Sequence, residues 1–207
     1  VDGYPHGVRI LHVSTRLILG GSQENTLLSC EGQARLGHEV HLAYGPIFGP
    51  EGSMYERAST FRTADGRGIG MHEVPDLCRE LSPRRDRRCV TQLRELIAKL
   101  KPDIVHTHSS KAGILGRIAA YLHARTPSSP AVIHTIHGPP FMPIEGGALR
   151  RLKVRAINKL YELSEKYAAH RCHLIVSVAN AMTKQFLARG IGRPEQYITV
   201  HSGMEVD

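Results

Sequence analysis

The sequence predicts an α/β fold of the Rossmann-like type, with a doubly wound, mainly parallel sheet of about seven strands and helices on both faces. Short segments rich in β-branched residues recur along the chain, and each is followed by turn residues and then by a helical pattern. This alternation is typical of parallel strands joined by right-handed crossovers. The expected strands cover residues 8–13, 39–44, 69–74, 103–107, 131–136, 173–178 and 197–200.

The segments between the strands carry apolar residues at spacings of three and four, so each is expected to turn one apolar helix face to the sheet. Two such helices are expected around residues 89–100 and 115–122. The longest predicted helix runs from Leu149 to Ala169, with a mostly basic face opposite its apolar side. That apolar side consists of Leu149, Leu152, Ala156, Leu160 and Leu163.

Length and charge limit the domain organisation and the partners. With 207 residues, of which 41% are hydrophobic, the chain suffices for one domain: residues 1–7 are interpreted as a tail and residues 8–207 as a single Rossmann-like domain. A formal net charge of +8 favours anionic partners such as phosphates or acidic lipid head groups. Aromatic residues make up only 5%, and no nucleic-acid-binding motif appears, so no nucleic acid is expected as a partner.

The spacing of the cysteines and the hydropathy of the chain indicate the cellular compartment in which the protein works. Four cysteines lack both C-x-x-C spacing and the density of a disulfide scaffold, which favours a reduced, cytoplasmic protein. No stretch approaches the roughly 20 apolar residues of a membrane helix. Membrane contact is therefore expected only as a peripheral association with an anionic surface, at the inner face of the cell membrane.

The loop after the first strand contains Gly20 and Gly21 and opens a helix. Free backbone N–H groups at a helix start suit an anion or sugar hydroxyls, and glycines allow a ligand to approach the backbone closely. The loop is neither G-x-G-x-x-G nor a Walker A motif. The alternative interpretation is a tight turn in which Ser22 is the N-cap of the helix.

The loop after the fourth expected strand places imidazoles, hydroxyls and an ammonium at another helix start. A phosphate or polyol could bind there through His108, Ser109 and Lys111. The alternative is that His106 points into the sheet as a core histidine with its hydrogen bonds satisfied, while Ser109 or Ser110 caps the helix.

The loop after the fifth expected strand begins with His137, which Gly138 and two prolines could aim into the cleft. Strand alternation predicts His134 and Ile136 on one face of the sheet and Thr135 and His137 on the other. No H-E-x-x-H motif and no H-x-H flanked by carboxylates appears, so no metal is expected and a hydrogen-bonding histidine is preferred.

Two groups of basic residues allow two interpretations each. The arginines at 84, 85, 87 and 88 could form a patch that docks on an anionic membrane or acceptor, or they could be the solvated first turn of a helix. The same choice applies to Arg150, Arg151, Lys153 and Arg155 on the long predicted helix.

Seven motifs occur in order along the chain, at residues 20–27, 36–40, 49–52, 101–113, 134–138, 177–179 and 200–204. Each motif alone is weakly specific, but their order is specific. Together they resemble the N-terminal domains of family 4 glycosyltransferases, which form one half of a GT-B fold.

The resemblance implies a retaining, metal-independent transfer of a sugar from a nucleotide-sugar donor to an acceptor, in cell-envelope or exopolysaccharide glycan synthesis. It implies no cofactor, with a UDP- or GDP-sugar as co-substrate, and a glycan, lipid-linked or phosphorylated acceptor. The N-terminal half holds the acceptor, and the donor-binding C-terminal domain is absent from this chain. The isolated chain is therefore expected to be inactive without its own C-terminal domain.

Site residues follow from the same resemblance by position. His137 matches the histidine near the transferred sugar and is the expected catalytic residue. Gly20 and Gly21 match the glycine loop that lies against donor phosphate and acceptor. The remaining expected substrate-binding residues are Gln23, Glu24, His108, Ser109, Lys111 and Gly138.

Two other functions remain open from the sequence. A non-catalytic module that binds a sugar phosphate or nucleotide could use the same loops. A nicotinamide-dependent epimerase or dehydrogenase would need a G-x-G-x-x-G loop and usually a Tyr-x-x-x-Lys pair, and neither is found.

Overall fold

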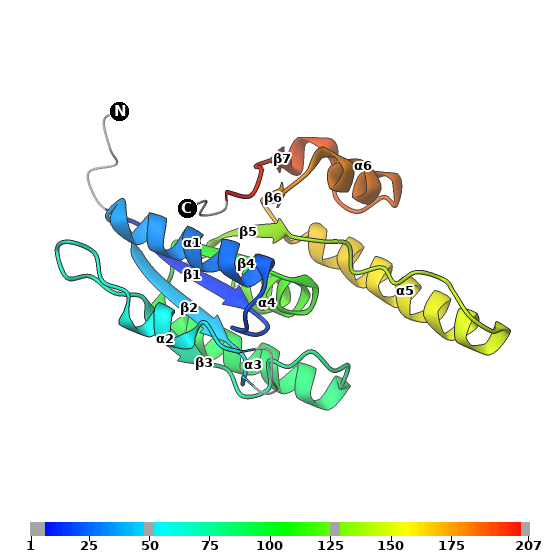
Figure 1. The fold of residues 1–207 in the computed structure, drawn as a ribbon, viewed down its shortest axis with the longest axis horizontal. Coiled ribbons are helices and arrows are strands. Elements are labelled where there is room, and N and C mark those ends of the chain that lie inside the picture. Colours follow the sequence, from blue (N-terminus) through cyan, green and yellow to red (C-terminus); the bar gives the residue numbers. More distant parts are fainter. Residues whose placement is uncertain (1–6, 48–51, 125–128, 204–207) are drawn as a thin grey trace.

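The computed structural model describes residues 7–47, 52–124 and 129–203. Its seven strands form one fully parallel sheet in the order β3-β2-β1-β4-β5-β6-β7 (Figure 1). The predicted fold class and strand number are confirmed. The strands are β1 (Arg9–Ser14), β2 (Glu39–Tyr44), β3 (Gly70–Glu73), β4 (Ile104–His108), β5 (Ala131–Ile136), β6 (Leu174–Ser177) and β7 (Tyr197–Thr199).

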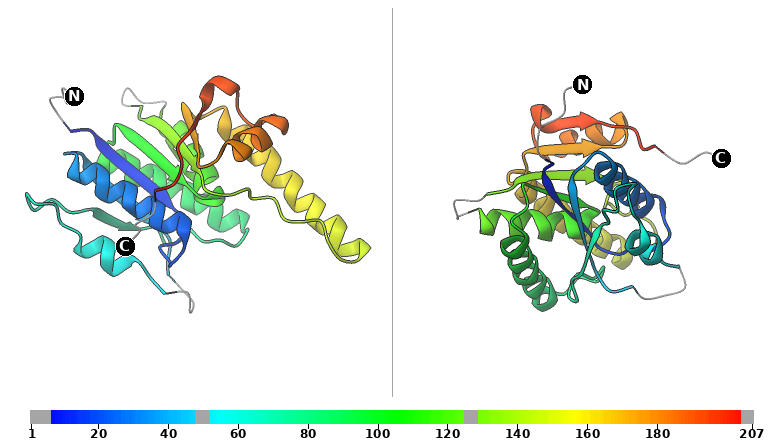
Figure 2. Two further views of the ribbon diagram at one scale, coloured as in Figure 1. Left: turned by 45° about the horizontal axis from the view of Figure 1, so that its top comes forward. Right: turned by 90° about the vertical axis from the view of Figure 1, so that its left-hand side faces the viewer.

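Helices lie on both faces of the twisted sheet, as the two views of Figure 2 show. One face is covered by α1 (Gly21–Arg35) and α2 (Tyr55–Thr60), which share a core with β2 and β3. The other face carries α3 (Pro83–Leu100), α4 (Ser110–His123), α5 (Ala148–Ala169) and α6 (Asn180–Ala188). A short 3-10 helix, Pro194–Gln196, precedes β7.

Alternation along the strands separates the two cores. In β2, Val40 and Leu42 face α1 and pack with Leu27, while Ala43, which follows Leu42, faces the opposite core. In β1, Leu11 and Val13 belong to that opposite core, together with Leu93 and Ile97 of α3 and others. Strands buried on both faces read as continuous apolar runs, and this explains why the sequence pattern located them.

Helix α4 lies unusually close to the sheet because two of its residues have no side chain. A Cβ built on Gly113 would lie 2.4 Å from the ring of His134, and one on Gly116 would lie 2.7 Å from Cγ2 of Thr107. Any larger residue at either position would push α4 away from β4 and β5. This contact fixes where the first turn of α4 meets the carboxyl edge of the sheet.

Helix α5 contradicts the expectation that its leucine-rich side packs on the sheet. Leu149 is 83% exposed, Leu152 is 64% exposed, and Leu160 and Leu163 are also exposed. The buried residues of α5 are instead Val154, Glu165, Ala168 and Ala169. Three of these four lie in the C-terminal part of the helix, and its first half projects outward (Figures 1 and 2).

The segment before α5 runs back along the projecting helix. The side-chain amide of Asn158 accepts a hydrogen bond from the backbone N–H of Met142 at 2.9 Å and donates one to its carbonyl at 2.8 Å. Met142 and Ile144 are themselves exposed. The projecting part of the structure therefore presents apolar side chains from both the helix and this segment.

Some expected features lie partly or wholly outside the described residues. These are most of the tail 1–7, most of the 49–52 motif and the end of the chain after residue 203. Among the described residues, no helix is long and apolar enough to cross a membrane. The four cysteines are free thiols.

A buried ion pair joins α4 to α5. Nη2 of Arg117 lies 2.6 Å from Oε2 of Glu165, and both side chains are 2% exposed or less. The same guanidinium donates through Nε to the carbonyl of Gly113 at 2.8 Å. A buried pair of this kind contributes little net stability when intact, but removal of one partner leaves an uncompensated buried charge.

We expect Arg117→Met to lower the free energy of unfolding by about 3 to 5 kcal/mol, measured by urea denaturation, because the carboxylate of Glu165 then stays buried without its partner. Lys159→Met removes one partner of the more exposed Lys159–Glu162 pair and should change it by less than about 1 kcal/mol. Equal losses for the two variants would contradict a special role for the buried pair.

Candidate functional site

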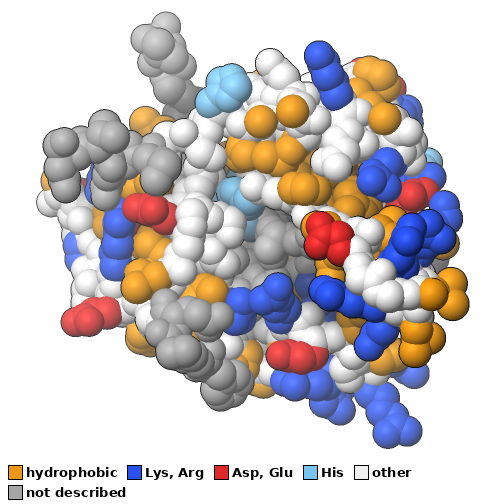
Figure 3. Space-filling view, turned by 45° about the vertical axis from the view of Figure 1, so that its right-hand side comes forward, with side chains coloured by type: hydrophobic (Ala, Val, Ile, Leu, Met, Phe, Trp, Pro, Cys, Tyr) orange, Lys and Arg blue, Asp and Glu red, His pale blue; other side chains and the backbone are white. Residues whose placement is uncertain are grey.

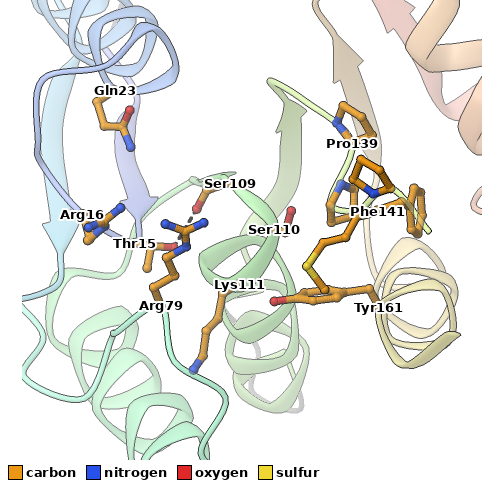
Figure 4. A pocket seen from close by; sticks show the side chains of 13 residues that line it. Thr15, Arg16, Gln23, Arg79, Ser109, Ser110, Lys111, Pro139, Phe141 and Tyr161 are labelled. Atoms are coloured by element: carbon orange, nitrogen blue, oxygen red, sulfur yellow. Dashed lines mark hydrogen bonds between the residues drawn. The ribbon is translucent and has the colours of Figure 1, made fainter. Parts of the chain in front are cut away.

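A polar pocket opens at the carboxyl edge of the sheet, where the sequence predicted ligand-binding loops (Figure 4). Its volume is about 530 Å³. The loops after β1, β4 and β5 contribute to its walls, and Tyr161 of α5 closes one side. The lining residues are Thr15, Arg16, Gln23, Arg79, Ser109, Ser110, Lys111, Pro139, Pro140, Phe141, Met142, Pro143 and Tyr161.

The glycine loop leads directly into α1. Gly20 is the N-cap residue and α1 begins at Gly21, so the interpretation of Ser22 as N-cap is wrong. The Ser22 hydroxyl instead donates to Oε1 of Gln23 at 2.8 Å, and Gln23 lines the pocket. A Cβ on Gly21 would meet no atom within 4 Å, so the protein itself leaves this position open.

The start of α4 is capped from another strand. Ser109 is the N-cap residue, but its side chain makes no capping bond, because its hydroxyl bonds Oγ1 of Thr15 at 2.7 Å (Figure 4). Thr15 in turn accepts the backbone N–H of Ala112 at 3.2 Å and so acts as the cap. Ser109 has φ of 60°, a left-handed conformation that costs about 1 kcal/mol or more outside glycine. Thr15 was missed because it lies about 95 residues from the helix that it caps.

Lys111 lines the pocket mainly with its aliphatic stem. The side chain is buried, and its ammonium lies 2.7 Å from Oδ1 of Asp86 and also bonds the carbonyl of Glu80. Its charge is thus already compensated within the protein, which disfavours the phosphate-binding interpretation. Two cations that the sequence analysis did not select, Arg16 and Arg79, line the pocket instead. Arg79 is exposed and makes no ion pair with another described residue.

Behind the pocket, histidines of β1, β4 and the loop after β5 meet on the α1 side of the sheet. His108 is fully buried; its Nε2 lies 2.9 Å from Nδ1 of His12 and its Nδ1 lies 3.1 Å from Nε2 of His137. His12 was not selected from the sequence. His106 bonds Oγ1 of Thr135 at 2.8 Å, which supports its interpretation as a satisfied core histidine.

The predicted alternation along β5 agrees with these contacts. His134 points to the α4 side, where its Nδ1 lies 3.0 Å from Oγ1 of Thr107, whereas Thr135 and His137 contact the histidines of the α1 side. Sequence reasoning therefore assigned the correct face to His137. It could not foresee that His108 links His137 to His12, because the His108–His12 contact depends on the strand order.

Burial keeps these imidazoles neutral. Desolvation lowers the pKa of His12 and of His137 to about 4. It also lowers the pKa values of His106, His108 and His134 well below their ordinary value, and the neighbouring histidines add to the effect. At neutral pH each ring therefore carries one N–H donor and one acceptor nitrogen.

Three of the histidines also form a group that could hold a metal ion. His12, His106 and His108 each offer a ring nitrogen, and these atoms lie within 4.8 Å of one another. Neutral imidazoles suit transition metals, but the group contains no carboxylate to offset the charge of an ion. The bond between His12 and His108 would have to open first. The absence of a metal from the reaction stays a prediction.

Two arginines of the cluster at the start of α3 form ion pairs within the protein. Arg85 and Arg88 both contact the carboxylate of Asp76, at 3.3 and 2.8 Å. The hydrogen bond from Arg88 is the main reason why the pKa of Asp76 falls to about 2. Arg84, Arg87 and Arg88 are exposed, so three of the four arginines match the interpretation as a solvated helix start.

A model of the glycosyl transferase 4-like domain matches residues 20–203. The chain belongs to this family. The match includes the glycine loop, His106, His108 and His137, and every strand except β1.

Among characterised enzymes, the chain is similar to the UDP-Gal:alpha-D-GlcNAc-diphosphoundecaprenol alpha-1,3-galactosyltransferase of Escherichia coli, with 43% identity over 96 residues. That match covers 46% of this chain and 22% of the enzyme. The glycosyltransferase domain described here therefore matches only part of its relative.

Two solved structures share the fold. A sucrose-phosphate synthase from Thermosynechococcus elongatus superposes with a TM-score of 0.64 at 14% identity, over 95% of this chain and 48% of that protein. A glycosyltransferase from Rickettsia africae gives 0.63 at 18% identity, over 96% and 43%. The chain thus spans less than half of each structure and has the Rossmann-like fold of one half of a GT-B glycosyltransferase.

The structure brings some of the expected site residues together. Gln23, Ser109 and Lys111 line the main pocket, and His108 and His137 form the histidine group behind it. Gly20 and Gly138 lie in the adjoining loops and Gly21 and Glu24 in the first turn of α1, but none is among the lining residues, and their roles stay predictions. Gly138 is exposed, with open space where a Cβ would stand.

The buried histidines predict how stability depends on pH. Between about pH 6.5 and 4 the unfolded chain binds protons that the folded histidines reject, so the free energy of unfolding should fall as pH falls through this window. Each proton contributes up to about 1.4 kcal/mol per pH unit. Urea denaturation at successive pH values measures this slope, and a constant stability down to pH 4.5 would show that the imidazoles are not held neutral.

Proposed function

We propose that this domain is the acceptor-side half of a retaining, metal-independent glycosyltransferase that moves a hexose from a UDP- or GDP-sugar to an acceptor. The proposal rests mainly on the polar pocket beside the open glycine loop, in a chain that belongs to the glycosyl transferase 4-like family. A second domain would bind the donor, and the isolated domain would then be inactive. A non-catalytic binding module would use the same pocket without turnover.

The pocket suits a phosphorylated acceptor. The guanidinium groups of Arg16 and Arg79 offer forked donors that match phosphate oxygens, and Gln23 and Ser110 offer partners for sugar hydroxyls. The Escherichia coli relative acts on a sugar attached to diphosphoundecaprenol, according to its name. We therefore propose a prenyl-diphosphate-linked sugar as the acceptor, and cell-envelope polysaccharide synthesis as the process.

The start of α1 would stabilise the charge that develops during transfer. Its first backbone hydrogen bond runs from Glu24 N–H to the Gly20 carbonyl at 2.9 Å, so the N–H groups of the preceding turn have no acceptor within the helix. These N–H groups and the positive end of the helix dipole would favour a departing diphosphate. The open space at Gly21 would let the ligand reach them.

We expect Gly21→Val to lower sugar transfer by the complete protein at least about tenfold with little change in thermal stability, because the added side chain meets ligand and not protein. The assay follows transfer from UDP- and GDP-hexoses to a prenyl-diphosphate-linked sugar. Gly32→Val is the matched control, since Gly32 lies in the same helix with equally open space. Normal transfer by Gly21→Val would show that the loop is only a turn.

We also propose that the projecting half of α5 docks on an anionic membrane at the cytoplasmic face. Residues 148–161 contain five basic residues and no acidic residue. Leu149 and Leu152 of this segment are exposed, and Met142 and Ile144 extend the apolar surface. Basic and hydrophobic side chains adjoin on the side of the molecule that carries α5 (Figure 3). This combination is typical of amphipathic helices that lie in the interface of an anionic bilayer.

Docking through α5 would bring the pocket to the lipid surface. Tyr161 belongs to α5 and Met142 to the segment bound by Asn158, and both line the pocket. A prenyl-linked acceptor carries its diphosphate at that surface. The location of the basic and apolar residues and the proposed substrate therefore support each other.

We expect the protein to co-sediment with vesicles that contain phosphatidylglycerol and to bind pure phosphatidylcholine vesicles more weakly, because five basic residues face the anionic head groups. Leu152→Glu should reduce this binding severalfold without destabilising the fold, since the side chain is 64% exposed. Leu36→Glu, at an exposed leucine after α1, should leave it intact. Equal loss in both variants, or no preference for the anionic lipid, would exclude α5 as the docking element.

A further inference from the structure

A continuous row of four hydrogen-bonded side chains runs behind the pocket, from α1 to the loop after β5. Nε2 of His12 lies 2.7 Å from Oε1 of Gln33, and Nδ1 of His12 lies 2.9 Å from Nε2 of His108. Nδ1 of His108 then lies 3.1 Å from Nε2 of His137. We call Gln33, His12, His108 and His137 the histidine row.

The sheet register produces this row. His12 is paired with His106 in the β1–β4 ladder, and His108 follows two residues later on the same face. The rings of His12 and His108 are stacked with centroids 5.1 Å apart, and those of His108 and His137 with centroids 5.3 Å apart. His12 and His108 are each 1% exposed or less, so water does not compete for their nitrogens.

Both inner rings use both of their nitrogens within the row. A neutral imidazole has one N–H and one lone pair, so every hydrogen bond in the row must point the same way. The oxygen of Gln33 can only accept, which assigns the proton of His12 to Nε2 and leaves its Nδ1 as an acceptor. His108 must then donate from Nε2 to His12, and His137 must donate from Nε2 to His108.

The consequence appears at the His137 end of the row, two residues before Pro139 of the pocket wall. Nδ1 of His137 makes no hydrogen bond to a described residue, and it is not among the buried atoms that lack a partner, so it is open to solvent. It is the one nitrogen of these three rings that the row leaves without a partner. The row fixes this nitrogen as an acceptor.

We propose that Gln33, His12 and His108 are positioning residues that hold His137 in the Nε2–H tautomer, so that its bare Nδ1 accepts a hydrogen bond from a substrate hydroxyl. This inference rests on the proposed function for the contact with a sugar, but the tautomer itself does not. No proton leaves the substrate: the hydroxyl donates to Nδ1 and keeps its hydrogen. A tautomer fixed by a distant partner lets a neutral imidazole discriminate between a donor and an acceptor on the ligand.

The tautomers can be measured directly by ¹⁵N NMR of the imidazole rings in the complete protein at neutral pH. We expect His12, His108 and His137 all to carry their proton on Nε2. A proton on Nδ1 of His137, or a doubly protonated ring in the row, would overturn the proposal. Stoichiometric binding of added Zn²⁺ at neutral pH, with loss of the His12 to His108 bond, would also overturn it and identify the group as a metal site.

Gln33→Met removes the acceptor that sets the direction of the hydrogen bonds in the histidine row, and it nearly keeps the side-chain volume. We expect His137 to become a mixture of tautomers in this variant and the kcat for sugar transfer to fall about tenfold, with less change in KM. His72→Phe is the matched control, because His72 bonds His41 in a separate pair at the β2–β3 edge. It should change neither the tautomers of the row nor the rate.

The NMR measurement and the transfer assay test the positioning role and the proposed function separately. If the complete protein transfers no sugar with any tested donor, the proposed function fails, and the NMR spectrum of the unaltered protein still decides the tautomers. If transfer occurs but Gln33→Met changes the tautomers without changing kcat or KM, the positioning role is refuted while the proposed function stands. Should Gln33→Met fail to fold, the spectrum of the unaltered protein alone remains the deciding test.

Discussion

Polar residues occupy the centre of this parallel sheet, and each must find a partner inside the protein. Strands β1, β4 and β5 carry His12, His106, His108 and His134 at positions where such sheets usually have aliphatic residues. An unpaired buried donor or acceptor costs about 1 to 3 kcal/mol, so these side chains restrict the neighbouring elements to arrangements that pair them. Gln33 of α1 and Thr135 of β5 meet this need, and α4 comes close enough to enclose His134.

Local sequence patterns predicted the strands well because they report the environment of each residue along its own segment. Contacts between distant segments were beyond them. The pairing of Lys111 with Asp86, the cap that Thr15 supplies to α4, and the place of His12 in the row all depend on strand order and crossover geometry. The proximity of Arg16 to the end of β1 was visible in the sequence, and position alone could have selected it as a pocket residue.

The error at α5 has a different physical origin. An apolar stripe at helical spacing shows that one face of a helix prefers to leave water, but it does not identify what covers that face. In α5 the domain covers Ala168 and Ala169 and leaves Leu149 and Leu152 exposed. The glycine loop gives a similar lesson: Ser22 has a side chain suited to capping, yet α1 starts one residue before it.

Helix α5 is anchored to the domain near its C-terminal end, and its first half projects from the domain. Its anchored end is defined by the Arg117–Glu165 pair and the small residues beside it, whereas its first half projects and is bonded through Asn158 to the segment that contains Met142. Tyr161 lies one turn before the anchor and forms a wall of the pocket. A force on the projecting first half of α5 would therefore bend the structure near Tyr161. The shape of the pocket would then depend on the surface that this half of the helix contacts.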